Sequence, residues 1–500
     1  MERPKCIIIG SGLGGLSSGI ILAKHGYQVT VLEQGVQIGG CLQCFSRGGA
    51  RFETGMHFVG SADEGEVLHD LLSYLEVLPE LQLSRLDTTS YNIISLAGER
   101  FRFANGAEPF IETLSQSFPR QKDQLRRYMQ LVGEVASASS VRSMSGQTSN
   151  PSLLKYQLLS IGEVLDEVID DPLLQNVLCG DASLYAGVRD KTPFALHAFL
   201  ADFYNRSAFR IAGGSDQIAT LMQKTLARYG GEVRTRCKVT SVLCNETKAT
   251  GVEINGSEFL PADLILSDIH PQALFPMVQS KALRPAFRSR IAEIPNTPAV
   301  FSLFLKFREG AMPYMNSNFF SYRADHPWNC ETYTSEDWPK GYLYMHLCDK
   351  QETNTVQKSA RSGVALTYQH ASDLAPWKDT TIGHRGADYE AYKQQLAERL
   401  LDQLEVDFPN IRASIDRYYT ATALTYRDYT STTNGSMYGV LKDVAKGPDY
   451  RVSYKTKIPN LLLVGQNVNS HGILGVLVGT IMACSSLIGG AELANDIYKR

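Results

Sequence analysis

Residues 5–33 read KCIIIGSGLGGLSSGIILAKHGYQVTVLE, in which a glycine cluster separates an apolar run from a segment with helical spacing. Residues 6–9 are apolar and β-prone, and residues 16–25 carry apolar side chains at the spacing of a helix, which Gly26 ends. Residues 28–32 are apolar and β-prone again. The pattern therefore predicts a strand, a tight turn, a helix and a second strand, which together form a βαβ unit.

The glycine cluster is Gly10-Ser11-Gly12-Leu13-Gly14-Gly15, a G-x-G-x-x-G pattern at the turn from strand to helix. Gly10 permits the tight turn, Gly12 leaves room for a pyrophosphate beside the backbone, and Gly15 lets the helix pack close to the sheet. The first amides of the helix, near Leu13 and Gly14, offer the positive end of the helix dipole to the phosphate. We therefore interpret the cluster as a dinucleotide site; the alternative is a glycine turn in an ordinary βαβ unit.

An acidic residue stands where the second strand ends. The carboxylate of Glu33 is placed to accept hydrogen bonds from both ribose hydroxyls of a dinucleotide, and Gln34 follows it. The same carboxylate would repel a 2′-phosphate, so this site excludes NADP. A strand, a glycine turn opening a helix, and this acid together favour a dinucleotide over the plain turn.

Length and composition restrict the remaining possibilities. A chain of 500 residues exceeds what one hydrophobic core serves, so we expect two domains, which can interleave in sequence. Hydrophobic residues make up 43% and charged residues 20%, with a formal net charge of -3 and scattered Lys and Arg. No basic face is indicated, so we expect no nucleic-acid partner.

Nine cysteines and the absence of a secretory leader favour a reducing, cytoplasmic location. No window holds eighteen uninterrupted apolar residues: the nearest, residues 473–488, is punctuated by Gly475 and Gly479. That segment is typical of a buried helix. Peripheral contact with a membrane stays open.

The rest of the chain alternates between helical and strand-like patterns. Helical spacing dominates residues 65–205, notably 67–78 and 161–177, and the polar residues 137–151 predict an exposed loop or lid. The segments expected next are an αβ unit at 211–229, strands at 232–244, 251–254 and 262–268, β-rich runs at 299–307, 341–347, 363–369 and 418–429, a helix at 389–404, a strand leading into glycine at 460–465, and a final helix to 500.

Two further blocks carry a family resemblance. The first is Gly35-x-x-x-Gly39-Gly40, followed by Gly48-Gly49-x-x-Phe52-Glu53-Thr54-Gly55-Met56-His57-x-x-Gly60. It resembles the flavin-binding N-terminus of the phytoene desaturase, carotenoid isomerase and retinol saturase group. Its Thr-Gly-x-His-x-x-Gly part is most similar to the all-trans-retinol 13,14-reductase (retinol saturase) branch.

The second block lies at the C-terminus, where Asn460-Leu-Leu-Leu-Val-Gly465-Gln466-Asn467 precedes Gly472-Ile473-Leu474-Gly475. It is similar to the closing flavin-binding motif of that family. Residues 213–214 and 230–242 resemble the family's middle segment, in which a strand near Val239 contacts the adenine. Residues 426–429 and 435–439 also fit the saturase branch. The family often has an acidic residue in the closing motif; here Gln466 or Asn467 would bond the ribityl chain instead.

The resemblance implies FAD as the cofactor and a two-domain α/β flavoprotein, in which a Rossmann-type FAD-binding domain carries an inserted α+β substrate domain. We expect residues 1–60, 206–270 and 455–500 to form the FAD-binding domain, and 61–205 and 271–454 the substrate domain. The expected cofactor-binding residues are Gly10, Gly12, Leu13, Gly14, Gly15, Glu33, Gln34, Gly39, Gly40, Met56, His57, Val239, Gly465, Gln466, Asn467, Gly472, Ile473 and Gly475.

The resemblance places His57 near the flavin ring, where it would orient substrate or move a proton, although a histidine bonded to backbone at a turn is an equal alternative. Tyr438 is the second catalytic candidate, against the alternative of a pocket wall. Cys41 and Cys44 form a C-x-x-C; no second C-x-x-C completes a zinc site, so we expect no metal and favour two packed thiols over a redox disulfide.

The implied function is that of an FAD-dependent oxidoreductase acting on carbon–carbon double bonds of an apolar polyene, with saturation favoured. The alternatives are a carotenoid desaturase or isomerase, an amine oxidase-like enzyme with an aromatic cage, and a flavin-containing protein without turnover. No second G-x-G-x-x-G is present, so the electron donor or acceptor, NAD(P)H or a redox protein, must come from outside.

Overall fold

The computed structural model describes residues 2–138, 151–349, 357–446 and 452–498. Its central layer is a five-stranded parallel sheet in the order β10-β2-β1-β14-β21. The strands are β10 (Glu232–Arg234), β2 (Gln28–Leu32), β1 (Lys5–Ile9), β14 (Leu264–Ser267) and β21 (Leu461–Leu463). Segments that are far apart in the chain therefore meet at one carboxyl edge, which is where ligands bind in sheets of this kind.

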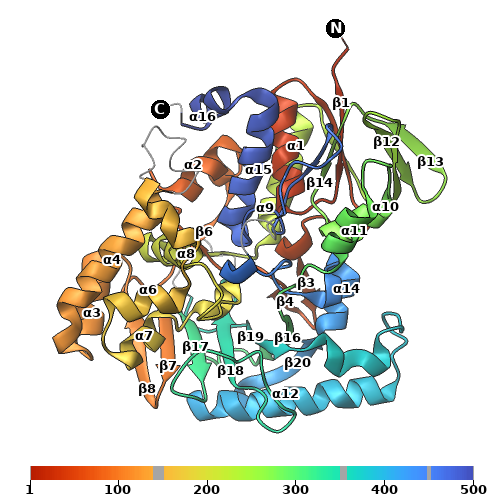
Figure 1. The fold of residues 1–500 in the computed structure, drawn as a ribbon. Helices are drawn as coiled ribbons and strands as arrows, with labels where there is room; N and C mark the ends of the chain where they lie inside the picture. The colour runs from red at the N-terminus through yellow and green to blue at the C-terminus, as the bar shows by residue number, and fades with distance from the viewer. Residues whose placement is uncertain (1, 139–150, 350–356, 447–451, 499–500) are drawn as a thin grey trace.

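Three helices cover one face of this sheet: α1 (Leu13–Lys24), α9 (Asp216–Arg228) and α15 (Gly472–Ile488). Helices α1 and α15 lie side by side in Figure 1, although they come from opposite ends of the chain. The apolar side chains of α1 and α15 share one buried cluster with those of β1, including Ile8, Leu16 and Leu477. Burial of this apolar surface ties the two chain ends together.

The other face of the sheet is covered by a small sheet of strands β11 (Val239–Cys244), β12 (Ala249–Ile254), β13 (Glu258–Pro261) and β15 (Val278–Gln279). Helix α10 (Pro271–Met277) leads into β15, and helix α11 (Pro285–Ala292) follows it. Val242, Val252 and Leu274 pack there against Ile7 and Ile265 of the parallel sheet. The parallel sheet is therefore covered on both faces, as its nearly continuous apolar strands require.

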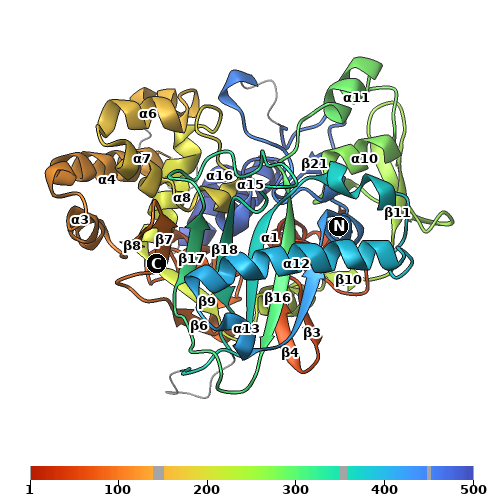
Figure 2. The same ribbon diagram turned by 90° about the horizontal axis from the view of Figure 1, so that it is seen from below.

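A second, seven-stranded sheet has the order β20-β16-β19-β18-β17-β7-β8. The strands are β20 (Ile415–Ala421), β16 (Ala299–Phe307), β19 (Ser362–Gln369), β18 (Gly341–His346), β17 (Asn318–Tyr322), β7 (Asn92–Leu96) and β8 (Glu99–Phe103). All neighbours pair antiparallel except β17 and β7. The long helix α12 (Ala387–Asp407) runs across these strands in Figure 2 and buries Leu396, Leu400 and Leu404 against the sheet.

Helices gather at the β8 edge of this sheet (Figure 1): α3 (Ala107–Ser115), α4 (Lys122–Ser137), α6 (Ile161–Val168), α7 (Pro172–Leu178) and α8 (Phe194–Arg206). The remaining elements are α2 (Val67–Tyr74), α13 (Ile411–Ser414), α14 (Ala423–Thr430), α16 (Gly490–Tyr498), the hairpin β3 (Cys44–Arg47) and β4 (Ala50–Glu53), and the three-stranded sheet of β5 (Val59–Gly60), β9 (Ala208–Ile211) and β6 (Leu83–Arg85). In the described part of the chain, no helix has the length and apolar character needed to cross a bilayer.

Most expected elements are confirmed, and several boundaries were wrong. Strands β6, β7 and β8 interrupt residues 65–205, where helices were expected; Ala97 and Gly98, both with positive φ, form the turn between β7 and β8. The helix expected at 161–177 is two helices, because Asp171 caps α7 and Pro172 begins it. The expected loop at 137–151 lies largely outside the described residues.

Three further boundaries differ downstream. The expected strand 232–244 is β10 and β11, which belong to different sheets. The β-rich run expected at 418–429 is strand only in β20, since Thr422 begins helix α14. The final helix is broken at Gly489, whose φ of 114° a residue with a Cβ rarely adopts. The Rossmann-type fold with an α+β part is confirmed, while the domain limits at 60, 206, 270 and 455 stay a prediction.

Candidate active site

One cavity of about 500 Å³ lies at the carboxyl edge of the parallel sheet and extends to the seven-stranded sheet. A volume of this order is typical of cofactor sites. Its wall includes sixteen of the residues expected from the sequence: Gly10, Gly12, Leu13, Gly14, Glu33, Gln34, Gly39, Gly40, Met56, His57, Val239, Tyr438, Gln466, Asn467, Gly472 and Ile473. The fold thus brings together residues from the beginning, middle and end of the chain.

Three expected residues, Gly15, Gly465 and Gly475, do not line the cavity. A Cβ on Gly15 would come to 2.1 Å from the carbonyl oxygen of Gly10, and one on Gly475 to 2.7 Å from the Ser470 side chain. These glycines therefore serve close packing behind the wall. Gly465 has a φ of 90°, so it also needs a glycine for its backbone conformation.

Glu33 is held at the end of β2 by three hydrogen bonds. Its Oε2 accepts one from the Ser11 amide (3.1 Å) and one from the Ser11 hydroxyl (2.5 Å), while Oε1 accepts one from the Gly35 amide (2.7 Å). The carboxylate borders the cavity beside the glycine turn. This is the arrangement expected for an acid that bonds a ribose.

Gln466 and Asn467 have different surroundings. The Oδ1 atom of Asn467 accepts a hydrogen bond from the Val440 amide (3.1 Å), and a Cβ on Gly439 would collide with this side chain. Asn467 therefore supports the segment at 439–440 that faces it. Gln466 borders the cavity and is half-buried, which favours it as the residue that bonds the ribityl chain.

His57 and Glu53 form a buried pair at the end of β4. Nδ1 of His57 lies 3.6 Å from the Glu53 carboxylate. Burial raises the pKa of Glu53, and contact with His57 opposes that rise. Arg210 of β9 donates a hydrogen bond to the backbone oxygen of His57 (3.3 Å), which fixes the segment in place.

Tyr438 stacks on His471, the residue that precedes helix α15. The ring centroids are 4.5 Å apart and the ring planes are inclined by 26°. Burial raises the pKa of Tyr438 and lowers that of His471 to about 3, so both rings are neutral at physiological pH. The Tyr438 hydroxyl donates to the backbone oxygen of Ser183 (3.3 Å). Tyr438 thus borders the cavity as an uncharged hydrogen-bonding group.

Cys41 and Cys44 are separate thiols in the structure. Burial, together with the nearby Asp268, raises the pKa of Cys41 to about 11. Burial and Glu53 raise that of Cys44 to about 12. Both thiols are therefore protonated at neutral pH and are poor nucleophiles. Among the described residues, no three His, Cys, Asp or Glu side chains gather as metal ligands would.

The end of the cavity at the seven-stranded sheet is apolar. Strands β16, β18 and β19 contribute Val300, Leu343, Met345 and Leu366 to its wall. Phe58, Leu184, Tyr204 and Met437 complete this wall. Sequence reasoning missed all eight residues, because only tertiary structure brings these strands against the glycine turn.

Asp268 was also missed as a site residue. It directly follows β14 and borders the cavity beside the glycine turn. Its position immediately after a buried parallel strand is a signal in the sequence, because such strands end at the ligand-binding edge.

Unpaired polar atoms show that the cavity suits a polar cofactor. Both ring nitrogens of His57 and the hydroxyl of Ser436 are buried and have no hydrogen-bond partner among the described residues. Buried polar groups are normally paired, so these atoms favour a ligand with donors and acceptors. Helix α15 begins at Gly472 in the cavity wall and directs its positive end there. Glu33, the glycine turn and these atoms fit FAD.

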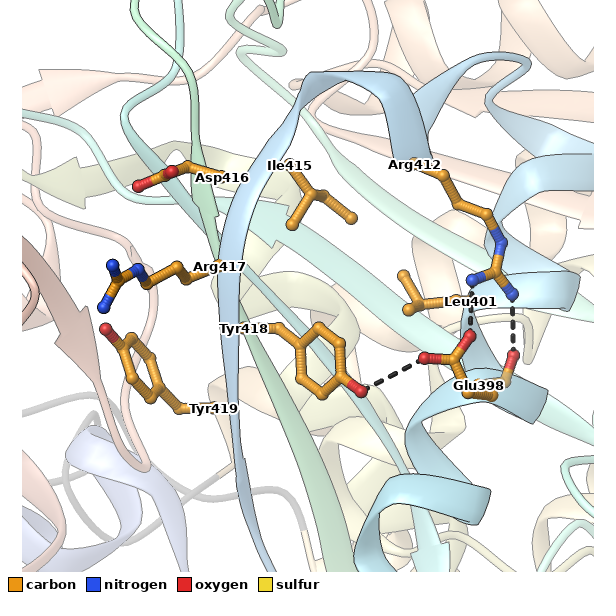
Figure 3. Close-up of a pocket in the computed structure, with 8 residues that line it drawn as sticks. All are labelled: Glu398, Leu401, Arg412, Ile415, Asp416, Arg417, Tyr418 and Tyr419. Atoms are coloured by element: carbon orange, nitrogen blue, oxygen red, sulfur yellow. Dashed lines mark hydrogen bonds and ion pairs between the residues drawn. The ribbon is translucent and has the colours of Figure 1, made fainter.

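A second hollow, of about 390 Å³, lies between α12 and β20 (Figure 3). Arg412 in this hollow is paired with Glu398 (2.6 Å), Asp402 (2.5 Å) and Glu405 (3.1 Å). Tyr418 donates to Glu398 at 3.1 Å. Because Arg412 already pairs with three carboxylates, it is poorly placed to bind an anion, and this hollow is separate from the glycine turn.

Comparison with known proteins agrees with this site. The family model described as flavin containing amine oxidoreductase matches residues 13–483. The all-trans-retinol 13,14-reductase of Rattus norvegicus is 28% identical over 99% of this chain and 87% of its own length. The 4,4'-diapolycopene oxygenase of a Methylomonas species is 24% identical over 94% of this chain and 95% of its own.

The fold is likewise similar to a solved structure of putrescine oxidase bound to putrescine, with a TM-score of 0.64, 16% identity and complete coverage of both chains. The resemblance to retinol saturases seen in the sequence is confirmed. The protein is an oxidoreductase whose cofactor is FAD. With the match extending over nearly its whole length, the chain belongs to the flavin containing amine oxidoreductase family.

Proposed function

We propose that the protein reduces a carbon–carbon double bond of an apolar polyene of the retinoid or carotenoid kind, most closely the saturation that an all-trans-retinol 13,14-reductase performs. The observation that carries the proposal is the continuity of the cavity from Glu33 to the apolar wall of Val300, Leu343 and Leu366. An apolar chain gains free energy from burial against this wall, and a cationic amine would find no carboxylate on it.

The names of the two relatives support this substrate class. One is a reductase of retinol and the other an oxygenase of diapolycopene, and both molecules contain a long conjugated polyene chain. The family name and putrescine oxidase point to amines instead. The composition of the cavity wall favours the polyene.

When bound, FAD supplies hydride or electron transfer. The protein's own residues bind the FAD and deliver the proton that saturation of a double bond requires. We assign the ribose to Glu33, the diphosphate to the amides beside Gly12, and the ribityl chain to Gln466. The expected cofactor-binding residues that line the cavity complete this assignment.

Saturation of a double bond also needs one proton on carbon. His57 is the proposed proton carrier, because it borders the cavity, Nδ1 faces Glu53 at 3.6 Å, and Nε2 has no hydrogen-bond partner among the described residues. Tyr438, whose hydroxyl is bonded to Ser183, is proposed to orient the polyene. The apolar wall excludes water from the reacting carbons.

The reducing equivalents are proposed to come from NAD(P)H or a redox protein, because the sequence holds one G-x-G-x-x-G. A cytoplasmic location stays a prediction from cysteine content. Peripheral membrane contact would give an apolar substrate a route to the cavity.

Anaerobic spectroscopy tests the proposal. Protein reduced with dithionite is mixed with all-trans-retinol, and oxidised protein is mixed separately with a carotenoid and with putrescine. We expect the flavin to be reoxidised by retinol, with a product that has gained two hydrogens by mass spectrometry. Bleaching of the oxidised flavin by the carotenoid would favour desaturation, and bleaching by putrescine would favour amine oxidation. If none of the three compounds changed the flavin spectrum, a flavin-containing protein without turnover would be favoured.

A matched pair of variants locates the substrate. Leu366→Trp fills the apolar end of the cavity, whereas Val406→Trp places the same ring on α12, where Val406 is 77% exposed. The first variant should keep its flavin spectrum and lose reoxidation by retinol. The second should behave like the unaltered protein. Equal activity of both variants would place the substrate elsewhere.

A further inference from the structure

Asp268 occupies the centre of the glycine turn. It follows β14, and its amide donates to the backbone oxygen of Ile9 (2.9 Å). A Cβ added to Gly12, Gly14 or Gly465 would come within 3.0 Å of one of its carboxyl oxygens. The glycine turn and the loop after β21 therefore close around this carboxyl group from two sides.

The amides at the start of α1 face the same carboxyl group. Hydrogen bonds from the backbone of Gly15 and Gly12 stabilise its charged form. These are the amides that a dinucleotide's diphosphate uses in a turn of this type. Asp268 thus lies beside the amides that the diphosphate would use.

The electrostatic surroundings of Asp268 disfavour negative charge. It touches the cavity on one side and is enclosed by protein on the others, and this burial raises its pKa to about 7. Glu33, at the end of β2, adds to the rise, while the two amides oppose it. Two negative phosphate charges at this place would raise the pKa further.

Few other titratable groups of the described residues face Asp268. Cys41, on the short helix Gly40–Leu42, is a neutral thiol with a pKa of about 11. His270, two residues along, is bonded through Nε2 to Asn296 (2.8 Å), and Lys238 borders the same cavity from the segment before β11. The parts of α1 and of the loop after β21 that face Asp268 are glycines.

We propose that Asp268 is a proton-linked member of the cofactor site: FAD binds together with one proton, which the Asp268 carboxylate takes up. The ionised carboxylate, the proton and the FAD dianion combine to give a neutral carboxyl group beside the bound diphosphate. Charge and protons balance in this step, and no further reactant is needed.

The pH dependence follows from the sign of the shift. Below pH 7 the free protein already carries the proton, so affinity for FAD is at its maximum and changes little with pH. Above pH 7 the proton must be taken from solution, and the dissociation constant rises by up to tenfold per pH unit. Between pH 7 and pH 9 we expect a loss of affinity on the order of a hundredfold.

Dilution of the purified holoprotein measures this affinity without any turnover. Protein is diluted into buffers between pH 6 and pH 9, and the fluorescence of released FAD gives the dissociation constant. Asp268→Asn keeps the size of the side chain and cannot ionise. We expect this variant to hold FAD with nearly constant affinity across the range and more tightly than the unaltered protein at pH 9.

Glu33→Gln is the matched control, because it removes the other carboxylate at this edge. It should weaken FAD binding at every pH, through loss of the ribose contact, and keep a pH slope above pH 7. If the unaltered protein and Asp268→Asn show parallel pH profiles, the proposal is wrong.

Calorimetry of the unaltered protein removes any dependence on the folding of a variant. Deflavinated protein is titrated with FAD at pH 8 in two buffers of different ionisation heat. The difference should correspond to uptake of about one proton per FAD. No uptake would overturn the proposal even if the substrate prediction holds, and uptake would support it even if retinol fails to react.

Discussion

Nη1 of Arg210 donates a hydrogen bond to the backbone oxygen of His57, and the Arg210 side chain is only 1% exposed. Nη2 of the same guanidinium donates to the backbone oxygen of Ser317 (3.0 Å). One buried cation on β9 therefore joins the segment after β4 to the segment before β17. His57 is held in place through its backbone, which leaves its ring free to face the cavity.

His57→Gln should lower the turnover of a reducible polyene by about a hundredfold, since a placed acid or base typically contributes that much or more. The flavin content should stay the same. Glu53→Gln should have a smaller effect, because Glu53 acts through the ring of His57, 3.6 Å away. Steady-state kinetics of the two single variants and the double variant measure both effects.

The double variant should be no slower than His57→Gln alone if Glu53 acts only as a positioning residue. His69→Gln, on the half-buried face of α2, is the matched control and should leave turnover unchanged. Additive losses in the double variant would show that Glu53 acts independently of His57.

Tyr438→Phe retains the ring stacked on His471 and removes the hydroxyl that bonds to Ser183. We expect FAD affinity to change little and kcat/KM for the polyene to fall by about tenfold, because the ring loses the hydrogen bond to Ser183 that fixes its position in the cavity wall. Tyr418→Phe, which removes a hydroxyl bonded to Glu398 in the separate hollow beside α12, is the comparison. If both variants had the same kcat/KM, the Tyr438 hydroxyl would have no role in turnover and the residue would only line the cavity.

We expect Gln466 and Asn467 to have different roles, one in binding FAD and the other in stabilising the fold. Gln466→Ala is expected to weaken FAD binding by roughly tenfold and leave the folded apoprotein's stability unchanged, because it removes a contact to the cofactor. Asn467→Ala should lower the free energy of unfolding by about 1–3 kcal/mol, because the buried Val440 amide loses its acceptor. Flavin fluorescence measures the affinity for FAD, and urea titrations measure the free energy of unfolding. If Asn467→Ala weakened FAD binding and Gln466→Ala lowered stability, the roles of the two residues would be reversed.

Gly14→Ala should abolish retention of FAD. Its Cβ would approach the Gly465 backbone nitrogen to 2.8 Å and also strike Asp268. Gly133→Ala, in the middle of α4, meets nothing within 4 Å and should stabilise the protein by about 0.5–1 kcal/mol. The absorbance spectrum and the thermal midpoint of each purified variant give the comparison, and flavin retained by Gly14→Ala would contradict the glycine-turn assignment.

Asp181 supplies a pH prediction away from the cofactor. Burial raises its pKa to about 7, against one hydrogen bond from Asn92 (3.0 Å). Between its unfolded and folded pKa values the native state keeps a proton that the unfolded chain releases, so stability falls by up to ~1.4 kcal/mol per pH unit. The stability of Asp181→Asn relative to the unaltered protein should rise between pH 5 and pH 7 and level off above pH 7. Urea titrations at each pH test this, and a constant difference would contradict it.

The local motifs were readable in the sequence because they depend on neighbouring residues. Gly10, Gly12 and Glu33 all lie in one βαβ unit, so their positions could be predicted from the local pattern. Strands β2 and β16 have the bounds expected from their apolar runs. The family resemblance added Gly39, Gly40 and the closing motif, which share no local pattern with the first unit.

The remainder of the site depends on contacts between distant segments. The apolar wall comes from β16, β18 and β19, whose sequences show only that they are buried strands. Asp268 acquires its surroundings only when β14 lies between β1 and β21. The hairpin of β7 and β8 was missed because its two strands sit among helical segments.

The arrangement of β21 and α15 also bears on synthesis of the protein. The strand that completes the parallel sheet and the helix that packs beside α1 both lie within the last forty residues. A ribosome-bound chain therefore holds the N-terminal glycine turn without its partners for nearly the whole of translation. Until β21 and α15 have been synthesised, the apolar face of α1 lacks its cover and is a natural binding surface for chaperones.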